Sequence, residues 1–144
     1  MAVKASLSIQ KAPGISLNIG SQLATKIIAT ALAKVRWRAK NSEVELRFVK
    51  SGEMKKLNKK FRGKNKPTDV LSFEVHRHGL LGMIMIDVET AARQAKEYRH
   101  SVRQEVRELF VHGICHLLGH DHEKPVDAKK MEKLERGLNR LWTR

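Results

Sequence analysis

Three histidines near the end of the sequence have a spacing that strongly constrains the local fold. They occur in "HGICHLLGHDH", which runs from residue 112 to residue 122 in the order H-x3-H-x2-G-x2-H. On a helix, His112 and His116 project from one face about one turn apart, because they are four residues apart. Gly119 tolerates the left-handed conformation that ends a helix, so the chain can turn and bring His122 toward the same point. The spacing predicts a helix, a glycine stop and a metal site.

Three neutral imidazoles with an open fourth position suit Zn²⁺ in a catalytic site better than in a closed structural one. Zinc there would lower the pKa of a bound water to about 7 and supply hydroxide. We predict one zinc ion per chain, held by His112, His116 and His122. The pattern resembles the zinc-binding sequence of metzincin proteases, except that Gly113 replaces the glutamate that serves those enzymes as general base. Peptide hydrolysis by that route is therefore disfavoured.

For other residues in and near this stretch, the sequence gives weaker indications of their roles. His120 is the alternative third ligand if His122 points away, and Asp121 either orients a ligand histidine or caps the turn. Cys115 is expected to be a small buried thiol rather than a ligand. Glu108 is either an acceptor for His112 or a solvated acid. The remaining histidines are isolated in the sequence and are expected to be exposed: His76, His78 and His100.

The order of apolar patterns predicts an α+β fold in a single domain, residues 1–144, with a small mixed β-sheet covered by helices and a zincin-like metal-binding helix. Asp87 is a candidate N-cap, and Ser101 with Gln104 has capping-box spacing. The expected elements are a short strand over 6–10, a helix from 21 to about 40, a strand over 44–49, a basic helix over 53–61, a hairpin over 70–87, and helices over 88–100, 101–118 and after 125.

The charge of the chain indicates a polyanionic partner. It has 29 Lys and Arg against 15 Asp and Glu, a formal net charge of +14, which favours nucleic acid or a ribonucleoprotein. Aromatic residues make up only 5%, so contact should be mainly with phosphates rather than through a broad stacking surface. No stretch has the apolar length of a signal peptide or a membrane span, and one cysteine excludes an internal disulfide. We expect a cytoplasmic protein without a membrane partner.

Two long motifs carry a resemblance to a known family. "HGICHLLGHDH" resembles the HGxLHLxGYDH signature of the YbeY family, and "FRGKNKPTDVLSF", residues 61–73, resembles its YRGKxKPTxVLSF segment. The resemblance implies a zinc-dependent, single-strand-specific endoribonuclease acting in 16S rRNA 3′-end processing and ribosome quality control. It implies single-stranded RNA, rRNA, and the ribosome or ribosomal proteins as partners. It also implies that His112, His116 and His122 are the zinc ligands and that Arg62 is a functionally important arginine.

Elementary chemistry supports a role for Arg62. Phosphodiester cleavage gathers negative charge on the non-bridging oxygens, and a guanidinium can meet them with two parallel hydrogen bonds. Lys64 and Lys66 would bind flanking phosphates, although for the lysines alone a solvated basic turn is the simpler interpretation. The chain departs from the family pattern at three positions, His120, Cys115 and Met83. At the position of Met83 the family usually has an acid.

The expected mechanism is attack on an RNA phosphate by zinc-bound hydroxide while Arg62 stabilises the charged transition state. No protein general base is identified, and the RNA 2′-hydroxyl is an alternative nucleophile. Two other functions remain open: a ribosome-assembly factor with a purely structural zinc site, and a metal-dependent peptidase. The sequence does not determine the oligomeric state.

Overall fold

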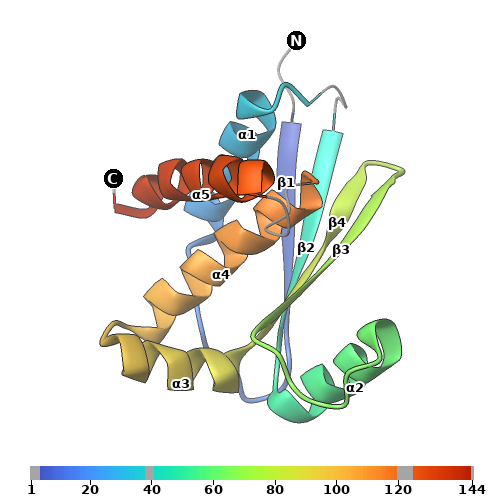
Figure 1. The fold of residues 1–144 in the computed structure, drawn as a ribbon, viewed down its shortest axis with the longest axis vertical. Coiled ribbons are helices and arrows are strands. Elements are labelled where there is room, and N and C mark those ends of the chain that lie inside the picture. Colours follow the sequence, from blue (N-terminus) through green and yellow to red (C-terminus); the bar gives the residue numbers. More distant parts are fainter. Residues whose placement is uncertain (1–3, 38–40, 120–124, 144) are drawn as a thin grey trace.

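A four-stranded mixed sheet forms the centre of the structure, a computed structural model that describes residues 4–37, 41–119 and 125–143 (Figure 1). The strand order is β1-β2-β4-β3, with β1 and β4 parallel to β2 and β3 antiparallel to β4. The strands are β1 (Lys4–Lys11), β2 (Asn41–Val49), β3 (Val70–Arg77) and β4 (Leu80–Asp87). The helices are α1 (Ser21–Lys34), α2 (Ser51–Arg62), α3 (Val88–Tyr98), α4 (Val102–Leu117), α5 (Pro125–Asn139) and the 3-10 helix η1 (Arg140–Thr143).

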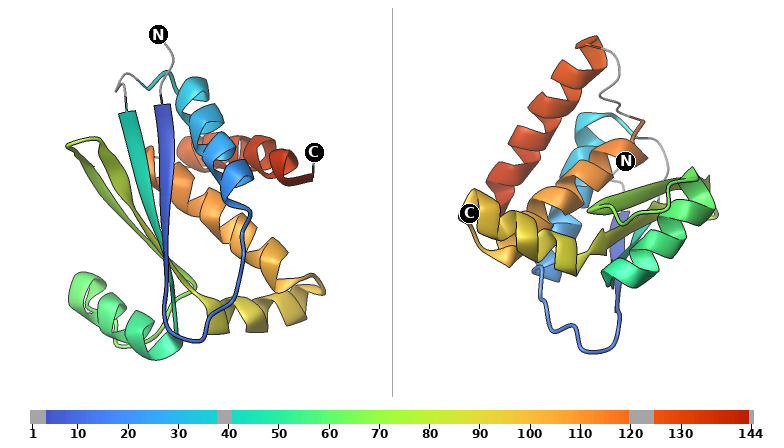
Figure 2. Two further views of the ribbon diagram at one scale, coloured as in Figure 1. Left: turned by 180° about the vertical axis from the view of Figure 1, so that it is seen from behind. Right: turned by 60° about the horizontal axis from the view of Figure 1, so that its bottom comes forward.

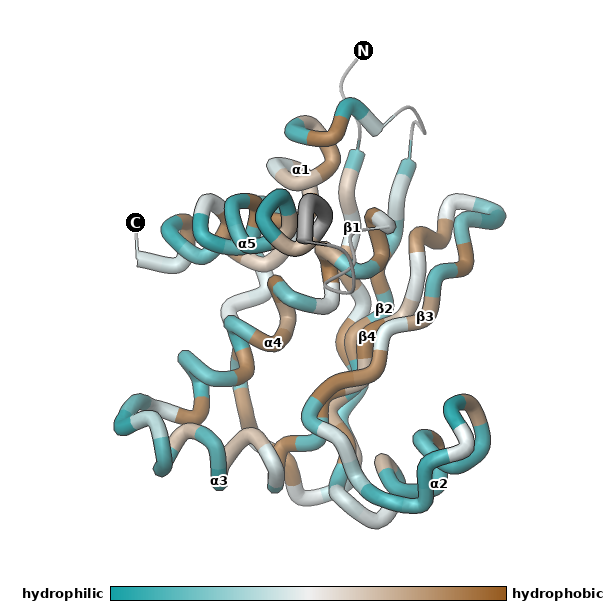
Figure 3. Tube along the Cα trace, viewed as in Figure 1, coloured by the Kyte–Doolittle hydropathy of each residue, from teal (hydrophilic) through white to brown (hydrophobic). Residues whose placement is uncertain are grey.

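Alternation along β2 and β4 creates two cores of unequal size, one on each face of the sheet. On one face, Val44, Leu46 and Ile84 belong to the main core, which the strands share with α1, α4 and α5. On the other face, Met85 joins a small core with Met54 of α2. Figure 3 shows hydrophobic residues concentrated along the central strands. The larger helices therefore cover one face of the sheet, and α2 packs against the opposite face (Figure 2).

Local capping chemistry sets the ends of α3 and α4, as the sequence predicts. The Asp87 carboxylate accepts hydrogen bonds from the backbone N–H groups of Glu89 and Thr90, at 3.0 and 3.2 Å. The Ser101 hydroxyl accepts one from the N–H of Gln104 at 3.0 Å. These bonds satisfy backbone donors that have no partner inside a helix. They confirm the two predicted helix starts.

Other boundaries differ from the expected ones. Helix α1 ends at Lys34, not near residue 40, because Arg36 has a left-handed backbone (φ 55°) and the Trp37 N–H bonds back to the Leu32 carbonyl at 2.9 Å. Left-handed arginine carries no sequence signature, whereas glycine would have shown one. Strand β2 begins at Asn41, three residues earlier than the apolar alternation indicates.

The fold class is the expected one, a small α+β domain with a mixed sheet. Within the described ranges, none of the helices is both long and apolar enough to cross a membrane.

Candidate functional site

Helix α4 lies unusually close to strand β4, and two glycines make this approach possible. A Cβ atom on Gly113 would be 2.9 Å from both Cδ1 and Cγ2 of Ile84. A Cβ atom on Gly82 would collide with the Phe73 carbonyl oxygen and the Leu117 side chain. Position 113 therefore faces the sheet and has no room for any side chain. The missing general base of the metzincin pattern is explained by packing: a glutamate here would separate α4 from β4.

His112 and His116 lie together on the half-buried side of α4, as their spacing predicts. Their Nε2 atoms are 3.0 Å apart, and the ring centroids are 4.5 Å apart. Two imidazole ligands of one tetrahedral zinc ion, each with Zn–N near 2.0–2.1 Å, would place their nitrogens about 3.3 Å apart. The pair thus fits a shared divalent ion after side-chain adjustments of a few tenths of an ångström.

Glu135 of α5 contacts His112, and sequence analysis missed it. Its Oε1 lies 3.1 Å from Nδ1 of His112, so the carboxylate can accept the Nδ1–H hydrogen bond and leave Nε2 directed at His116. A carboxylate on the second ring nitrogen is the usual partner of a metal-binding histidine, because it fixes the tautomer and the ring orientation. No spacing signal links Glu135 to His112, since the two helices meet only in the folded chain.

The third predicted ligand, His122, lies outside the described residues, as do His120 and Asp121. The predicted stop before them is present: Gly119 has φ 85°, and its N–H bonds to the His116 carbonyl at 2.9 Å. The ligand role of His122 therefore stays a prediction.

Cys115 belongs to the main core, where it is fully buried as a free thiol. Burial, with a smaller contribution from the negative charge of Glu135, raises the pKa of this thiol to about 12. A neutral buried thiol packs as a small apolar side chain, as expected from the sequence.

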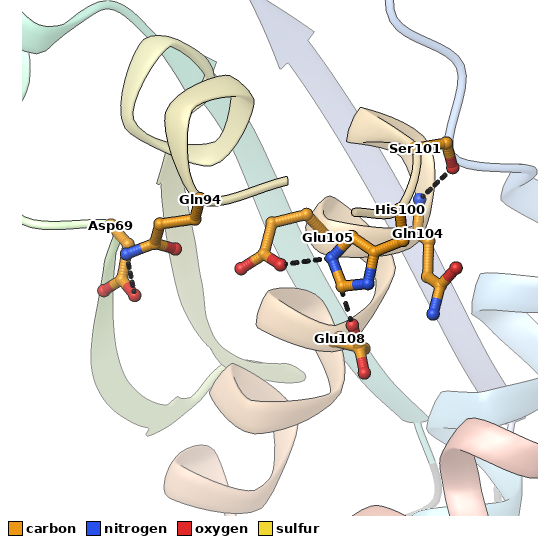
Figure 4. A network of polar contacts seen from close by, with 7 residues as sticks. All are labelled: Asp69, Gln94, His100, Ser101, Gln104, Glu105 and Glu108. Atoms are coloured by element: carbon orange, nitrogen blue, oxygen red, sulfur yellow. Dashed lines mark hydrogen bonds and ion pairs between the residues drawn. The ribbon is translucent and has the colours of Figure 1, made fainter. Parts of the chain in front are cut away.

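A second polar cluster lies at the opposite end of α4 (Figure 4). His100 Nε2 is 2.6 Å from Glu105 Oε1 and 3.8 Å from Glu108 Oε2. Ligand atoms of these three residues lie within 4.8 Å of one another, so in the described part of the chain this group could hold a metal ion. The expectation that His100 is isolated and exposed was wrong: its side chain is 17% exposed and tied to Glu105.

Glu108 contacts His100 rather than His112, so it is not the acceptor for His112 that its sequence position allowed. Burial raises the pKa of Glu108; the positive charge of His100 opposes that shift, and the negative charge of Glu105 adds to it. The carboxylate next to His112 is Glu135 instead.

The β3–β4 hairpin is attached to the same end of α4 that carries the histidine pair. His76 Nε2 lies 2.9 Å from the Leu117 carbonyl oxygen, and its ring meets Trp37 edge-on with centroids 5.0 Å apart. The backbone of His76 is left-handed (φ 49°). Beside this contact is an open hollow of about 330 Å³, lined by Trp37, Asn41, Ser42, His76, Arg77, His78, Gly79, Leu80 and Leu81.

The basic loop after α2 is anchored at two points by side chains. Gly63 (φ 69°) ends α2, and the buried Asn58 donates from Nδ2 to the Lys66 carbonyl at 2.8 Å. At the far end of the loop, Asp69 accepts from the Val70 N–H at 2.8 Å and from Gln94 Nε2 at 3.3 Å (Figure 4). The loop backbone is therefore anchored, while its cationic side chains are exposed: Arg62, Lys64 and Lys66.

The structure places Arg62 and the histidine pair on elements that pack against opposite faces of the sheet. Both elements adjoin the edge strand β3: α4 packs beside it, and Phe61 of α2 meets Phe73 of β3 with ring centroids 5.0 Å apart. Met83, where the sequence departs from the family pattern that it resembles, packs on the α2 face. It therefore lies on the side of the sheet opposite the histidine face of α4.

Comparisons with known proteins agree with this architecture. Residues 8–142 match the family model described as "Endoribonuclease YbeY". Curated proteins of that name include one from Aquifex aeolicus, 47% identical over 66% of this chain and 67% of its own length, and one from Moorella thermoacetica, 38% identical over 83% and 86%. The solution structure of TM1509 from Thermotoga maritima is similar in fold, with a TM-score of 0.63 and 27% identity over 94% of this chain and 88% of its own.

Proposed function

Since the chain belongs to the YbeY family, whose curated members are named endoribonucleases, we propose that residues 1–144 form one metal-dependent endoribonuclease domain that cuts single-stranded RNA. The observation that carries the proposal is the His112–His116 pair, with Nε2 atoms 3.0 Å apart and Glu135 on the outer nitrogen of His112. This geometry is what two ligands of one ion and their supporting carboxylate require.

We assign one Zn²⁺ ion to this pair, with His122 as the third ligand. When bound, zinc would supply a Lewis acid and a nucleophile at neutral pH. The protein's own contribution is positional. Gly113 and Ile84 seat α4 against the sheet, and Glu135 orients the His112 ring, so the two nitrogens are already directed at one point.

Arg62 is the residue that would stabilise charge on the reacting phosphate, and Lys64 and Lys66 would bind flanking phosphates. The anchored loop supports this role, because Asn58 and Asp69 fix the backbone from which these cations project. Because α2 and α4 adjoin β3 from opposite faces, the reacting phosphate would have to lie at the β3 edge to be within reach of both Arg62 and the histidine pair.

A proposal for the cellular role rests on the family resemblance and on charge. A net charge of +14 suits binding to RNA, and we propose that the substrate is rRNA in the cytoplasm, at 16S 3′-end processing and ribosome quality control. Ribosomal proteins would be the neighbouring partners.

The proposal is tested by zinc analysis of purified protein together with cleavage of a single-stranded RNA. We expect one zinc ion per chain, and loss of both zinc and cleavage in His112→Ala and His116→Ala. Arg62→Ala should retain zinc and lose about a hundredfold or more in rate, as when one preorganised anion-stabilising group is removed. Glu135→Gln, a positioning variant, should lower zinc affinity about 10- to 100-fold.

Two results would contradict the proposal. Zinc binding and cleavage that persist in His116→Ala would remove the metal site from the mechanism. A His116→Ala protein that folds and still supports rRNA maturation would favour the assembly-factor function. Product ends decide the nucleophile, because a 2′,3′-cyclic phosphate would identify the RNA 2′-hydroxyl.

A further inference from the structure

Helix α2 presents an exposed aromatic ring in the middle of a strongly basic surface. Phe61 is 53% exposed, and it shares the outer surface of α2 with Lys55, Lys56, Lys59, Lys60 and Arg62. The acidic residue of the helix, Glu53, lies in its first turn, about two turns before the ring. Figure 3 shows α2 as largely hydrophilic. The buried part of the helix is small, because Met54 and Asn58 are its buried residues.

The Phe61 ring is held in place rather than free to move. Its edge contact with Phe73 has a centroid distance of 5.0 Å and an interplanar angle of 61°. The ammonium group of Lys60 lies over the Phe61 ring, 5.3 Å from its centroid, so a ligand that stacks on that face would displace this flexible side chain. Phe73 packs against the small core beneath α2, so the ring is supported from below by the sheet. A supported, exposed aromatic face flanked by cations is the arrangement by which proteins bind unpaired bases.

We propose that Phe61 is a stacking site for one unpaired base of single-stranded RNA, with the lysines of α2 holding the phosphates on either side. The inference rests on the proposed function, because it assumes an RNA ligand. The low aromatic content of the chain argues against a broad stacking surface, whereas this proposal adds a single stacking contact. Single-stranded RNA fits better than duplex RNA, since a paired base has no free face to offer the ring. The charge of α2 is complementary to RNA and excludes a basic partner.

Phe61 precedes Arg62 in the sequence, so a base bound at Phe61 would lie near the Arg62 guanidinium. A base stacked on this ring would fix the adjoining phosphate close to the guanidinium and to the anchored loop that carries Lys64. The site therefore determines which part of the strand enters, while bond cleavage is left to other residues.

The test is equilibrium binding of the full-length protein to a fluorescently labelled 12-nucleotide single-stranded RNA, checked on a gel to be intact after the measurement. Phe61→Ala should weaken binding about 5- to 100-fold, the range for loss of one base–aromatic stack. Phe61→Trp should bind as well as the natural protein or better. Tyr98→Ala is the matched control, because Tyr98 is 65% exposed at the end of α3, away from α2, and its loss should change affinity less than twofold.

A second oligonucleotide of the same length, with abasic sites in place of its bases, separates stacking from phosphate contact. On this ligand the natural protein and Phe61→Ala should bind equally. The salt dependence of binding should be the same for both proteins, whereas Lys56→Gln should reduce the logarithmic salt slope by roughly 0.7 if that lysine contacts one phosphate.

Phe61→Leu is the control for loss of structure, because leucine keeps an apolar contact with Phe73 but has no aromatic face. Thermal unfolding should show that it is folded, and its RNA affinity should fall like that of Phe61→Ala. Unchanged RNA affinity in Phe61→Ala, or natural affinity in Phe61→Leu, would overturn the proposal. Because binding is measured without cleavage, failure of this site and failure of the ribonuclease activity are distinguishable.

Discussion

Replacing Gly113 with alanine tests whether close packing of α4 on β4 is what excludes a side chain at this position. The new methyl group would lie 2.9 Å from Cδ1 and Cγ2 of Ile84 and 3.1 Å from Cγ1, so one side-chain rotation cannot relieve all three contacts. Overpacking of this kind costs about 1–3 kcal/mol. Alanine recovers up to about 1 kcal/mol of helix propensity. We expect a net loss of about 1–2 kcal/mol in the free energy of unfolding.

The measurement is chemical and thermal unfolding of the natural protein and the variant under the same metal conditions. For a chain of this size the expected loss corresponds to a decrease of roughly 2–8 °C in Tm. Gly137→Ala is the matched control, because a methyl group in α5 would lie 3.6 Å from Lys34 Nζ, an ordinary contact. That variant should gain roughly 0.5–1 kcal/mol from helix propensity alone.

A double-mutant cycle with Ile84→Ala identifies the cause. Ile84→Ala alone should destabilise by about 2–5 kcal/mol, because it leaves a cavity. In that background, Gly113→Ala should be neutral or stabilising, since the opposing atoms are gone. If Gly113→Ala is as stable as the natural protein, or is equally harmful with and without Ile84, the packing argument is refuted.

Three further predictions concern groups whose environment the structure defines. Asn58→Ala should lose about 1–2 kcal/mol of stability in urea unfolding and increase amide exchange in the basic loop, because the Lys66 carbonyl loses its buried donor; unchanged exchange would contradict this anchoring role. Glu108→Gln should become more stabilising relative to the natural protein as pH rises from acid to neutral, measured as the difference in Tm. The folded-state pKa of Glu108 is raised above its unfolded-state pKa, so the natural protein loses stability as pH rises through these two values, because the ionised carboxylate is disfavoured in the fold. At lower pH the carboxyl is neutral in both states and the two proteins differ less. A difference in Tm that does not vary with pH would contradict this. Cys115 should react with iodoacetamide at pH 8 much more slowly in the native protein than in denaturant, by mass spectrometry, because the thiol is buried and its pKa is raised to about 12; equal rates would show that the helix opens readily.

Local chemistry made much of the fold predictable. Asp87, Ser101 and Gly119 act on backbone groups within three residues, so their types and spacing were enough to place the starts of α3 and α4 and the end of α4. The end of α1 was mispredicted because the left-handed residue there is Arg36, and nothing in an arginine indicates such a backbone.

The histidine pair was predictable for the same reason, whereas its supports were not. His112 and His116 are neighbours on one helix, but Glu135 reaches His112 from α5, and Ile84 of β4 packs against Gly113 between them, both through tertiary packing. The anchoring role of Asn58 was hidden as well, because its partner is a backbone carbonyl rather than a side chain. Sequence patterns report contacts within one element, and contacts between elements need the fold.

The contact of Gly113 with Ile84 and of Gly82 with Leu117 has a consequence for ion uptake. Helix α4 can neither slide along β4 nor roll over it unless the backbones of both elements move apart. The position of the His112–His116 pair relative to the sheet is thus fixed by this packing, and only small side-chain torsions of these two residues are needed for them to bind one ion. Reorganisation energy for this pair is correspondingly low, and removing the ion should leave the backbone of the sheet and of α4 where it is.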